Sequence, residues 1–393
     1  YINSIERFAD RPVFSMYEFE GESLTYREFG EKVSEVAELL RGAGLSSGDK
    51  VALLSTNMPN WPVCYFAAVS SGLIVVPILP DFSGPELDMI IQHSDAKGLM
   101  ASDKLYSKIS KEVVDKLNIV VRTKNLGVIS QTVEKQGTFE VPNPEDLAAI
   151  IYTSGTTSTP KGVMLTHYNL ASQILMEFDL FTIAPDDVFL SILPLSHTYE
   201  CSVGMLLPFM SGAHVIYMDK RPTASTLMPA MAKVRPTIML SVPLIIEKIY
   251  KSQVANRFNK KKLLSRLYAI PFFRKLIHRS AGKKLYNAFG GKLRFFGIGG
   301  AKLDEDTERF LMEARFPYAI GYGLTETAPL IAGAIPGKVK FRSTGPVLKG
   351  IKYRIEDTNP ETGEGEIVVL SPSTMKGYYK NPEATADVFT PDG

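Results

Sequence analysis

A loop rich in hydroxyl groups (residues 153–161) follows an apolar run in the stretch IIYTSGTTSTPKGVMLTH. Gly155 and Gly162 let the backbone turn tightly and present N–H groups to an anion, and Lys161 adds a mobile positive charge. The spacing differs from the common G-x-x-x-x-G-K-[ST] phosphate loop, because Pro160 directly precedes the lysine. The pattern still predicts a site that holds polyphosphate. Its hydroxyl donors are Thr153, Ser154, Thr156, Thr157, Ser158 and Thr159.

Four later segments carry further residues suited to nucleotide chemistry. They read LPLSHTYE (193–200), GIGGAKL (297–303), GYGLTETAP (321–329) and GEGEIVVLSPSTMKGYYKNPEAT (363–385). In this order, and together with the hydroxyl-rich loop, they resemble the motifs of the adenylate-forming (AMP-binding) superfamily, which includes acyl-CoA synthetases, luciferases and nonribosomal adenylation domains. The resemblance covers the whole chain, and within the superfamily the chain is most similar to the long-chain fatty acid–CoA ligases.

The resemblance implies roles that these residue types can fill. Tyr322 offers an aromatic face for adenine, and Thr325 would donate to the α-phosphate. Glu326 supplies a hard oxygen ligand suited to Mg²⁺, with Thr153 as the other protein contact near the metal. Taken singly, Tyr322 also fits a core tyrosine and Glu326 a surface glutamate. Nucleotide binding would further involve Ser154, Gly155, Thr156, Thr157, Gly299, Gly300, Ala301 and Gly321.

His197 has two interpretations. The resemblance places it in the pocket wall, where it would orient the substrate carboxylate or gate its tunnel, whereas the residue type alone fits a structural histidine equally well. Tyr199, Glu200 and the apolar residues 205–210 either line the acyl site or belong to the core.

The implied reaction is an in-line displacement. A carboxylate attacks the α-phosphorus of MgATP, which forms an acyl-adenylate and releases pyrophosphate. In the family the acyl group then passes to a thiol, usually that of coenzyme A. We therefore predict Lys161, Thr325, Glu326 and His197 as catalytic residues and a long-chain fatty acid as the substrate. Two other functions stay open: an adenylating domain that loads a carrier protein, and a nucleotide-binding module without catalysis.

The sequence departs from the family pattern in two motif positions and at its end. Ser158 stands where glycine is common, and Ile320 stands where many relatives have a polar residue. Ser158 is a small donor, so we expect phosphate binding to survive. The sequence stops at Gly393, where relatives continue into a Thr-Gly-Asp motif and a small mobile C-terminal domain. We expect 1–393 to be a large N-terminal domain that adenylates poorly by itself and forms no thioester.

Strands and helices alternate along the segments that must position these residues. Residues 24–48 predict a helix that follows a threonine cap. Residues 51–80 carry no charge and could cross a bilayer, but their prolines and polar residues favour a strand, a buried helix and a second strand. The alternation returns over 168–345, and short alternating segments follow near 340.

The predicted fold class is α/β, with two doubly wound, mostly parallel sheets sandwiched with helices plus a small antiparallel β-barrel-like module. Residues 1–180 would form a first α/β subdomain that ends in the phosphate loop. Residues 181–340 would form a second, with the adenine and acyl pocket, and residues 341–393 the barrel-like subdomain.

The net charge of +2 is unevenly distributed. Residues 248–303 contain fifteen Lys and Arg and no Asp or Glu, so the remainder carries 29 basic and 42 acidic residues, or −13. Within this segment, residues 257–284 mix bases with Leu, Ile and Phe at helical spacing. Such a face suits anionic lipid, an acidic substrate or a solvated helix surface. We expect no nucleic acid partner, because no RNA-binding or recognition-helix motif accompanies the charge.

The two cysteines, Cys64 and Cys201, lie far apart and match neither a disulfide framework nor a metal site. The first residues, YINSIERFADRPVF, show no apolar signal-peptide core. We therefore predict a cytoplasmic protein, with peripheral membrane contact through residues 257–284. The sequence is compatible with an oligomer.

Overall fold

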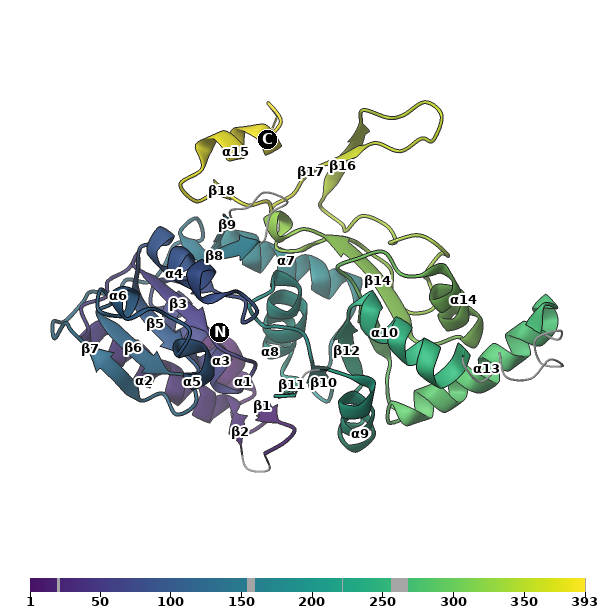
Figure 1. Ribbon diagram of the computed structural model, residues 1–393, viewed down its shortest axis with the longest axis horizontal. Coiled ribbons are helices and arrows are strands. Elements are labelled where there is room, and N and C mark those ends of the chain that lie inside the picture. Colours follow the sequence, from purple (N-terminus) through teal and green to yellow (C-terminus); the bar gives the residue numbers. More distant parts are fainter. Residues whose placement is uncertain (20–21, 154–159, 221, 256–267, 393) are drawn as a thin grey trace.

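The computed structural model describes residues 1–19, 22–153, 160–220, 222–255 and 268–392. Two eight-stranded sheets lie beside each other, with helices between and around them (Figure 1). The first sheet consists, in spatial order, of β18 (Gly377–Tyr378), β9 (Lys161–Thr166), β8 (Leu147–Thr153), β4 (Ile74–Pro77), β3 (Lys50–Leu54), β5 (Ala96–Ala101), β6 (Ile119–Arg122) and β7 (Val128–Gln131).

The second sheet joins strands from distant parts of the sequence. Its spatial order is β15 (Leu330–Gly333), β14 (Tyr318–Gly323), β13 (Phe295–Ile298), β12 (Ile238–Ser241), β10 (Val188–Ser191), β11 (His214–Tyr217), β1 (Pro12–Met16) and β2 (Ser23–Thr25). In both sheets the inner strands pair in parallel and antiparallel strands occupy the edges. The predicted pair of mostly parallel sheets is confirmed.

Helices cover the sheets and connect their parallel strands. The first ones in the chain are α1 (Ile2–Arg7), α2 (Tyr26–Gly42), α3 (Asn60–Ser70), α4 (Gly84–His93), α5 (Asp103–Tyr106) and α6 (Lys111–Val114). The following ones are α7 (His167–Leu180), the π-helix η1 (Glu200–Leu206), α8 (Leu207–Ser211), α9 (Ala224–Val234), α10 (Pro243–Tyr250) and the π-helix η2 (Lys251–Ala255). After these come α13 (Pro271–Ala288), α14 (Glu305–Ala314), the 3₁₀ turn η3 (Thr325–Thr327) and α15 (Pro382–Val388).

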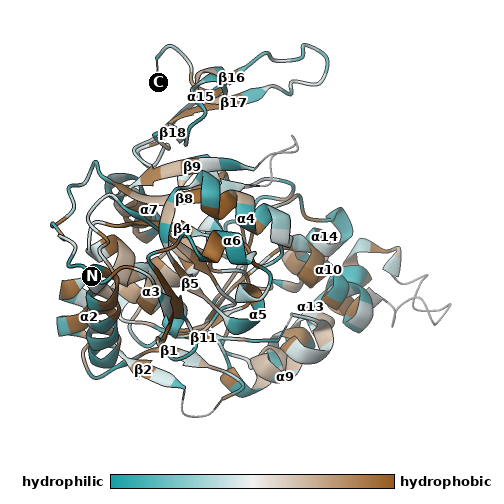
Figure 2. Cartoon of the chain, turned by 60° about the vertical axis from the view of Figure 1, so that its left-hand side comes forward, coloured by the Kyte–Doolittle hydropathy of each residue, from teal (hydrophilic) through white to brown (hydrophobic). Residues whose placement is uncertain are grey.

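Helix α2 forms as its sequence predicts. Thr25 Oγ1 accepts from the backbone N–H of Glu28, and the Glu28 carboxylate accepts from the backbone N–H of Thr25, so two exposed helix-end donors are satisfied. Phe29 and Val33, with the other apolar residues of the same stripe, are buried, and the opposite face is hydrophilic (Figure 2).

The uncharged stretch 51–80 forms β3, α3 and β4, as predicted. Residues 61–69 of α3 are all buried, in the core cluster that also contains side chains from both sheets, such as Val75 and Phe189. A helix covered on every side needs no polar face, which explains its composition. In the part of the chain that is described, no helix is both long and apolar enough to traverse a lipid bilayer.

Two local features differ from the sequence expectations. One strand was not expected: β9 lies between the hydroxyl-rich loop and α7, so the loop joins two antiparallel strands. Helix α7 follows β9, with Thr166 as its N-cap. The segment after 340 is antiparallel as predicted, but its described strands β16 (Lys352–Glu356) and β17 (Glu366–Leu370) form a two-stranded hairpin and no closed barrel. This hairpin extends away from the body (Figure 1).

Candidate nucleotide and acyl site

A pocket lies where β13 and β14 of the second sheet end, opposite the end of β8 in the first sheet. Parallel strands place their carboxyl ends at one edge, and open α/β sheets bind ligands at that edge. This strand-end pocket brings together eight of the predicted site residues, from segments that are far apart in the sequence. They are Thr153, His197, Gly299, Gly300, Gly321, Tyr322, Thr325 and Glu326.

The other predicted site residues lie outside this lining. Ala301 follows Gly300 and is exposed. Lys161 begins β9, and its Nζ lies 5.1 Å from the centre of the Tyr378 ring, beside the pocket. Predictions that concern the loop cannot be placed, because its central residues lie outside the described residues: Ser154, Gly155, Thr156, Thr157, Ser158 and Thr159.

Two glycines shape the loop after β13. A Cβ atom on Gly299 would lie 3.3 Å from the Tyr199 ring, so this ring lies against bare backbone. Gly300 has a φ of +85°, in a region that residues with a side chain rarely adopt. The Tyr199 ring therefore covers Gly299, whereas Gly300 presents bare backbone to the pocket.

Thr325 is oriented by a neighbouring hydroxyl group. The buried Thr198 Oγ1 donates to Thr325 Oγ1 over 3.3 Å. Because Thr325 accepts this bond, its own proton is available to another acceptor in the pocket. A phosphate oxygen of a bound nucleotide is such an acceptor.

The carboxylate of Glu326 is held by Tyr378. Strand β18 pairs with β9, with Tyr378 opposite Val163, and this register brings the Tyr378 hydroxyl to 2.8 Å from Glu326 Oε1. The backbone N–H of Met375 also donates to the Glu326 carbonyl over 2.8 Å. Burial, and then the bond to Glu326, raise the pKa of Tyr378, so its hydroxyl stays protonated and acts as the donor.

His197 presents its ring to the pocket. Its Nδ1 accepts a hydrogen bond from the backbone N–H of Tyr199 over 3.2 Å, which leaves the proton of the neutral ring on Nε2. The ring is accessible to solvent, but partial enclosure by the pocket walls lowers its pKa. The neutral imidazole can therefore donate from Nε2 to a carboxylate or phosphate oxygen.

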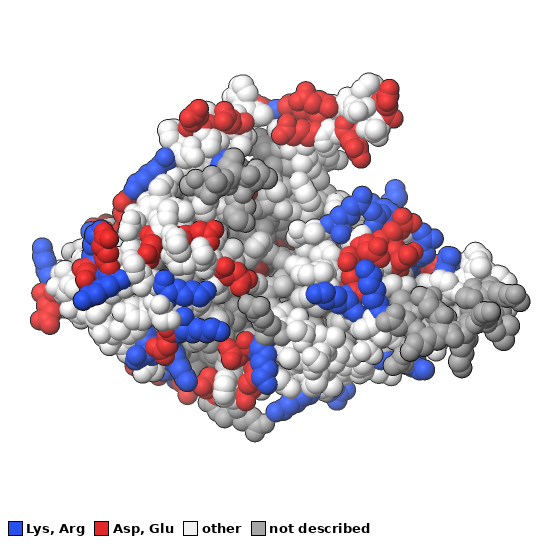
Figure 3. All heavy atoms as spheres, viewed as in Figure 1, with Lys and Arg blue, Asp and Glu red and all other residues white. Residues whose placement is uncertain are grey.

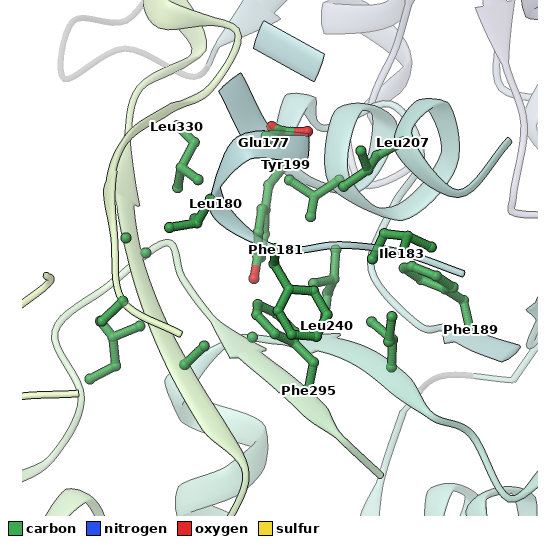
Figure 4. Close-up of a pocket in the computed structure, with 18 residues that line it drawn as sticks. Glu177, Leu180, Phe181, Ile183, Phe189, Tyr199, Leu207, Leu240, Phe295 and Leu330 are labelled. Atoms are coloured by element: carbon green, nitrogen blue, oxygen red, sulfur yellow. The ribbon is translucent and has the colours of Figure 1, made fainter. Parts of the chain in front are cut away.

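An apolar cavity adjoins the strand-end pocket, and Tyr199, Gly321 and Leu330 line both. Figure 4 shows Tyr199, Phe181 and Phe295 close together among the side chains that line this cavity, and the ring centres of Phe181 and Phe295 are 4.5 Å apart. Strands β10, β12, β13 and β14 form one wall, and α7 and η1 supply the opposite one. A ligand can therefore be polar at the strand ends and apolar beyond Tyr199.

Two buried carboxyl groups lie on or behind the wall of the apolar cavity. Glu177 lines it and accepts from Gln173 Nε2 over 3.0 Å and from Ser202 Oγ over 3.1 Å. Glu200 is 1% exposed and accepts from Ser191 Oγ. Burial raises the pKa of each to about 8, so both carboxyl groups are mainly uncharged at neutral pH.

Sequence reasoning missed three residues of this site. Tyr378 lies within a quoted motif, MKGYYKNPEAT, but nothing in its local sequence indicates contact with Glu326. Thr198 directly follows His197, and this position beside a predicted site residue was the only indication of its role. Glu177 interrupts an otherwise apolar helix face four residues after Gln173, and this i,i+4 polar pair was a usable signal.

Known proteins are similar to this chain in sequence and in fold. The chain is 27% identical to fatty acyl-CoA synthetase A of Dictyostelium discoideum, covering 94% of this chain and 61% of that protein. It is 28% identical to the peroxisomal long chain acyl-CoA synthetase 7 of Arabidopsis thaliana (94% and 58%) and 28% identical to 4-coumarate-CoA ligase 1 of Narcissus pseudonarcissus (99% and 70%). The chain thus spans about three fifths of the length of the first two relatives.

The ATP-bound structure of MatB from Rhodopseudomonas palustris superposes with a TM-score of 0.77 at 25% identity, covering 100% of this chain and 73% of that one. The AMP complex of O-succinylbenzoate coenzyme A synthetase from Bacillus subtilis has the same fold, with a TM-score of 0.77 at 20% identity over 99% of this chain and 73% of that one. The model of the AMP-binding enzyme family matches residues 3–379. The chain belongs to the AMP-binding enzyme family.

Proposed function

We propose that the full-length protein is an acyl-CoA synthetase that activates a long-chain fatty acid with ATP and transfers the acyl group to coenzyme A. One observation carries this proposal: the strand-end pocket and the apolar cavity adjoin each other and share Tyr199, Gly321 and Leu330 in their linings. Similarity to acyl-CoA synthetases at 27–28% identity supports the reaction class. A 4-coumarate-CoA ligase is equally similar in sequence, so sequence similarity does not distinguish between acids. The identity of the acyl chain is therefore inferred from the cavity.

In the first step a carboxylate oxygen of the acid attacks the α-phosphorus of ATP. The new O–P bond forms the acyl-adenylate while the bond to the leaving pyrophosphate breaks. Thr325 would donate to an α-phosphate oxygen, and His197 Nε2 would orient the acid. Lys161, beside Tyr378, would neutralise phosphate charge. In the second step the thiolate of coenzyme A attacks the acyl carbonyl and AMP leaves.

The residues present suit Mg²⁺ bound with a nucleotide. The Tyr378 hydroxyl donates to Glu326 Oε1, and Glu326 Oε2 has no protein partner in the described chain. Thr153 lines the same pocket. No group of three or more His, Cys, Asp or Glu side chains that could hold a metal occurs among the described residues, which fits an ion that takes most of its ligands from phosphate and water. Bound there, Mg²⁺ would neutralise phosphate charge.

The long-chain preference rests on the composition of the cavity wall. Apart from Glu177, its lining offers almost only apolar side chains and glycines. Glu177 is mainly protonated at neutral pH and therefore places little charge against an alkyl chain. A cavity of this kind stabilises methylene groups at about 0.8 kcal/mol each and has little to offer a charged substrate tail. We further propose a cytoplasmic location for the protein, and an oligomer stays a prediction.

Pyrophosphate exchange by the full-length protein tests this function. We expect exchange to require both ATP and an acid, and to rise with chain length across straight-chain acids. Ala319 lines the cavity on β14, and Ala319→Leu should lower exchange with long acids while short acids retain their rate, which serves as the internal control for folding. Exchange without any acid would indicate a different nucleotide reaction. Transfer to a carrier-protein thiol but not to coenzyme A would contradict the proposed acceptor.

A further inference from the structure

Helix α13 is fixed to the body through one face. Its Arg274 donates to Glu313 of α14, with Nη2 2.8 Å from Oε1, and both side chains are largely buried. His278 and Leu285 are buried on the same side. A Cβ on Gly282 would lie 2.5 Å from the Cβ of Ala314, so the two helices approach closely there. The rotation of α13 about its own axis is therefore set by contacts along its whole length.

The opposite face of α13 is exposed and apolar over its first turns. Phe272 is 67% exposed and Leu276 47%, and their i,i+4 spacing places them side by side. Ile270, before the helix, and Phe273 are also exposed. Four large apolar side chains thus reach solvent within seven residues, which would be costly without a partner.

The same face becomes basic over the following turns. Arg279 and Lys283 continue the line of Phe272 and Leu276 at positions i+7 and i+11, and all four side chains are exposed. Lys275 and Lys284 flank this line. None of these four basic side chains forms an ion pair within the described part of the chain, and the surrounding segment 248–303 contains no acidic residue.

We propose that this surface, consisting of Ile270, Phe272, Phe273, Leu276, Arg279 and Lys283, docks the protein onto a bilayer that contains anionic lipid. The apolar side chains would enter the interface between headgroups and acyl chains, while the basic ones would contact lipid phosphates. Binding to such a membrane requires apolar and basic side chains on the same face of the helix. A helix that faces only water would have no use for exposed Phe272 and Phe273.

The distribution of charge over the molecule favours one orientation on such a surface. Acidic side chains gather on the β16–β17 hairpin, at the top of Figure 3, whereas α13 lies at the lower right-hand side of the molecule in the matching view of Figure 1. Residues 352–366 contain five acidic and two basic residues. An anionic membrane would repel the hairpin and attract α13, so the protein would bind with the hairpin away from the lipid.

Vesicle flotation with the full chain tests this proposal. Vesicles of phosphatidylcholine alone are compared with vesicles containing about one third phosphatidylserine, at low and high salt. We expect binding only to the anionic vesicles, and weaker binding at high salt. The double variant Arg279→Gln/Lys283→Gln should lose about fivefold in affinity for each basic side chain removed. The exposed pair Lys104→Gln/Lys111→Gln, on α5 and α6, is the matched control and should bind as the wild type.

Phe272→Ser tests the apolar part, with Leu175→Ser as its control because Leu175 on α7 is 62% exposed. We expect at least a tenfold loss for the first and no change for the second. Equal binding to neutral and anionic vesicles, equal loss in the control variants, or no binding to any vesicle would overturn the proposal. The last outcome would favour an acidic protein as the partner. Unchanged melting temperatures of the variants confirm that their folds are intact.

Discussion

The buried carboxyl group of Glu200 should make the stability of the fold fall as pH rises. Its side chain is 1% exposed, Ser191 donates to one oxygen, and the other oxygen has no hydrogen-bond partner among the residues that the structure describes. Burial raises its pKa from an ordinary value near 4.5 to about 8. Between these values the folded protein holds a proton that the unfolded chain has released, so unfolding becomes easier with each pH unit.

The size of the effect follows from this difference in pKa. Each pH unit inside the window is worth about 1.4 kcal/mol, so Glu200 should lower the free energy of unfolding by roughly 2 to 3 kcal/mol between pH 5.5 and pH 7.5. Glu200→Gln removes the titrating group and keeps the shape of the protonated acid. Relative to the wild type, the variant should therefore gain roughly 2 to 3 kcal/mol over that pH interval.

Urea unfolding of both proteins at several pH values measures the gain. With a slope of about 3 kcal/mol per molar urea, the difference between their midpoints should change by ~0.8 M. Background titration, including that of the histidines, cancels because only the difference between variant and wild type is used. Glu31→Gln, at an exposed position on α2, is the matched control for the loss of a glutamate. A difference that stays constant from pH 5.5 to 7.5 would show that Glu200 is charged in the fold and refute the reasoning.

Three further predictions concern the site and its support. Tyr378→Phe should lower pyrophosphate exchange by about 10- to 100-fold because Glu326 loses its donor, whereas Tyr379→Phe, whose hydroxyl contacts another carboxylate, should not. Asp187→Asn should lower the free energy of unfolding by about 3 kcal/mol, measured in urea, because a buried carboxylate bonded to an arginine and a threonine is replaced. The KM for a long acid should rise above about pH 8 as Glu177 ionises, and Glu177→Gln should remove this rise.

Local patterns were sufficient for much of the fold. The Thr25 cap, the stripe of α2 and the uncharged α3 are properties of neighbouring residues, so periodicity and composition predict them. The family resemblance grouped Gly299, Tyr322 and Glu326 in one site, and all three line the strand-end pocket, at the edge where parallel strands end.

Features that depend on long-range pairing were not predictable in this way. Strand β1 pairs with β11, so residues near the start of the chain complete the second sheet. Strand β18 has only two residues, and their pairing with β9 carries no periodic signal. The contact between Tyr378 and Glu326 results from this pairing, and composition cannot indicate it. Strand β9 was not predicted for the same reason, because it is recognisable only beside β8.

The two sheets must keep a fixed relation, because the site takes residues from both. Asn57, in the loop after β3, bonds to the segment that carries His197: its Nδ2 donates to the Leu193 carbonyl over 2.7 Å and its Oδ1 accepts from the Leu195 N–H over 3.0 Å. These two bonds join the first sheet to the pocket wall of the second. The pairing of β18 with β9 makes a second connection, through Tyr378. A ligand that contacts Thr153 and Glu326 at once therefore meets a site already aligned by the protein, and little of its binding energy is spent on ordering it.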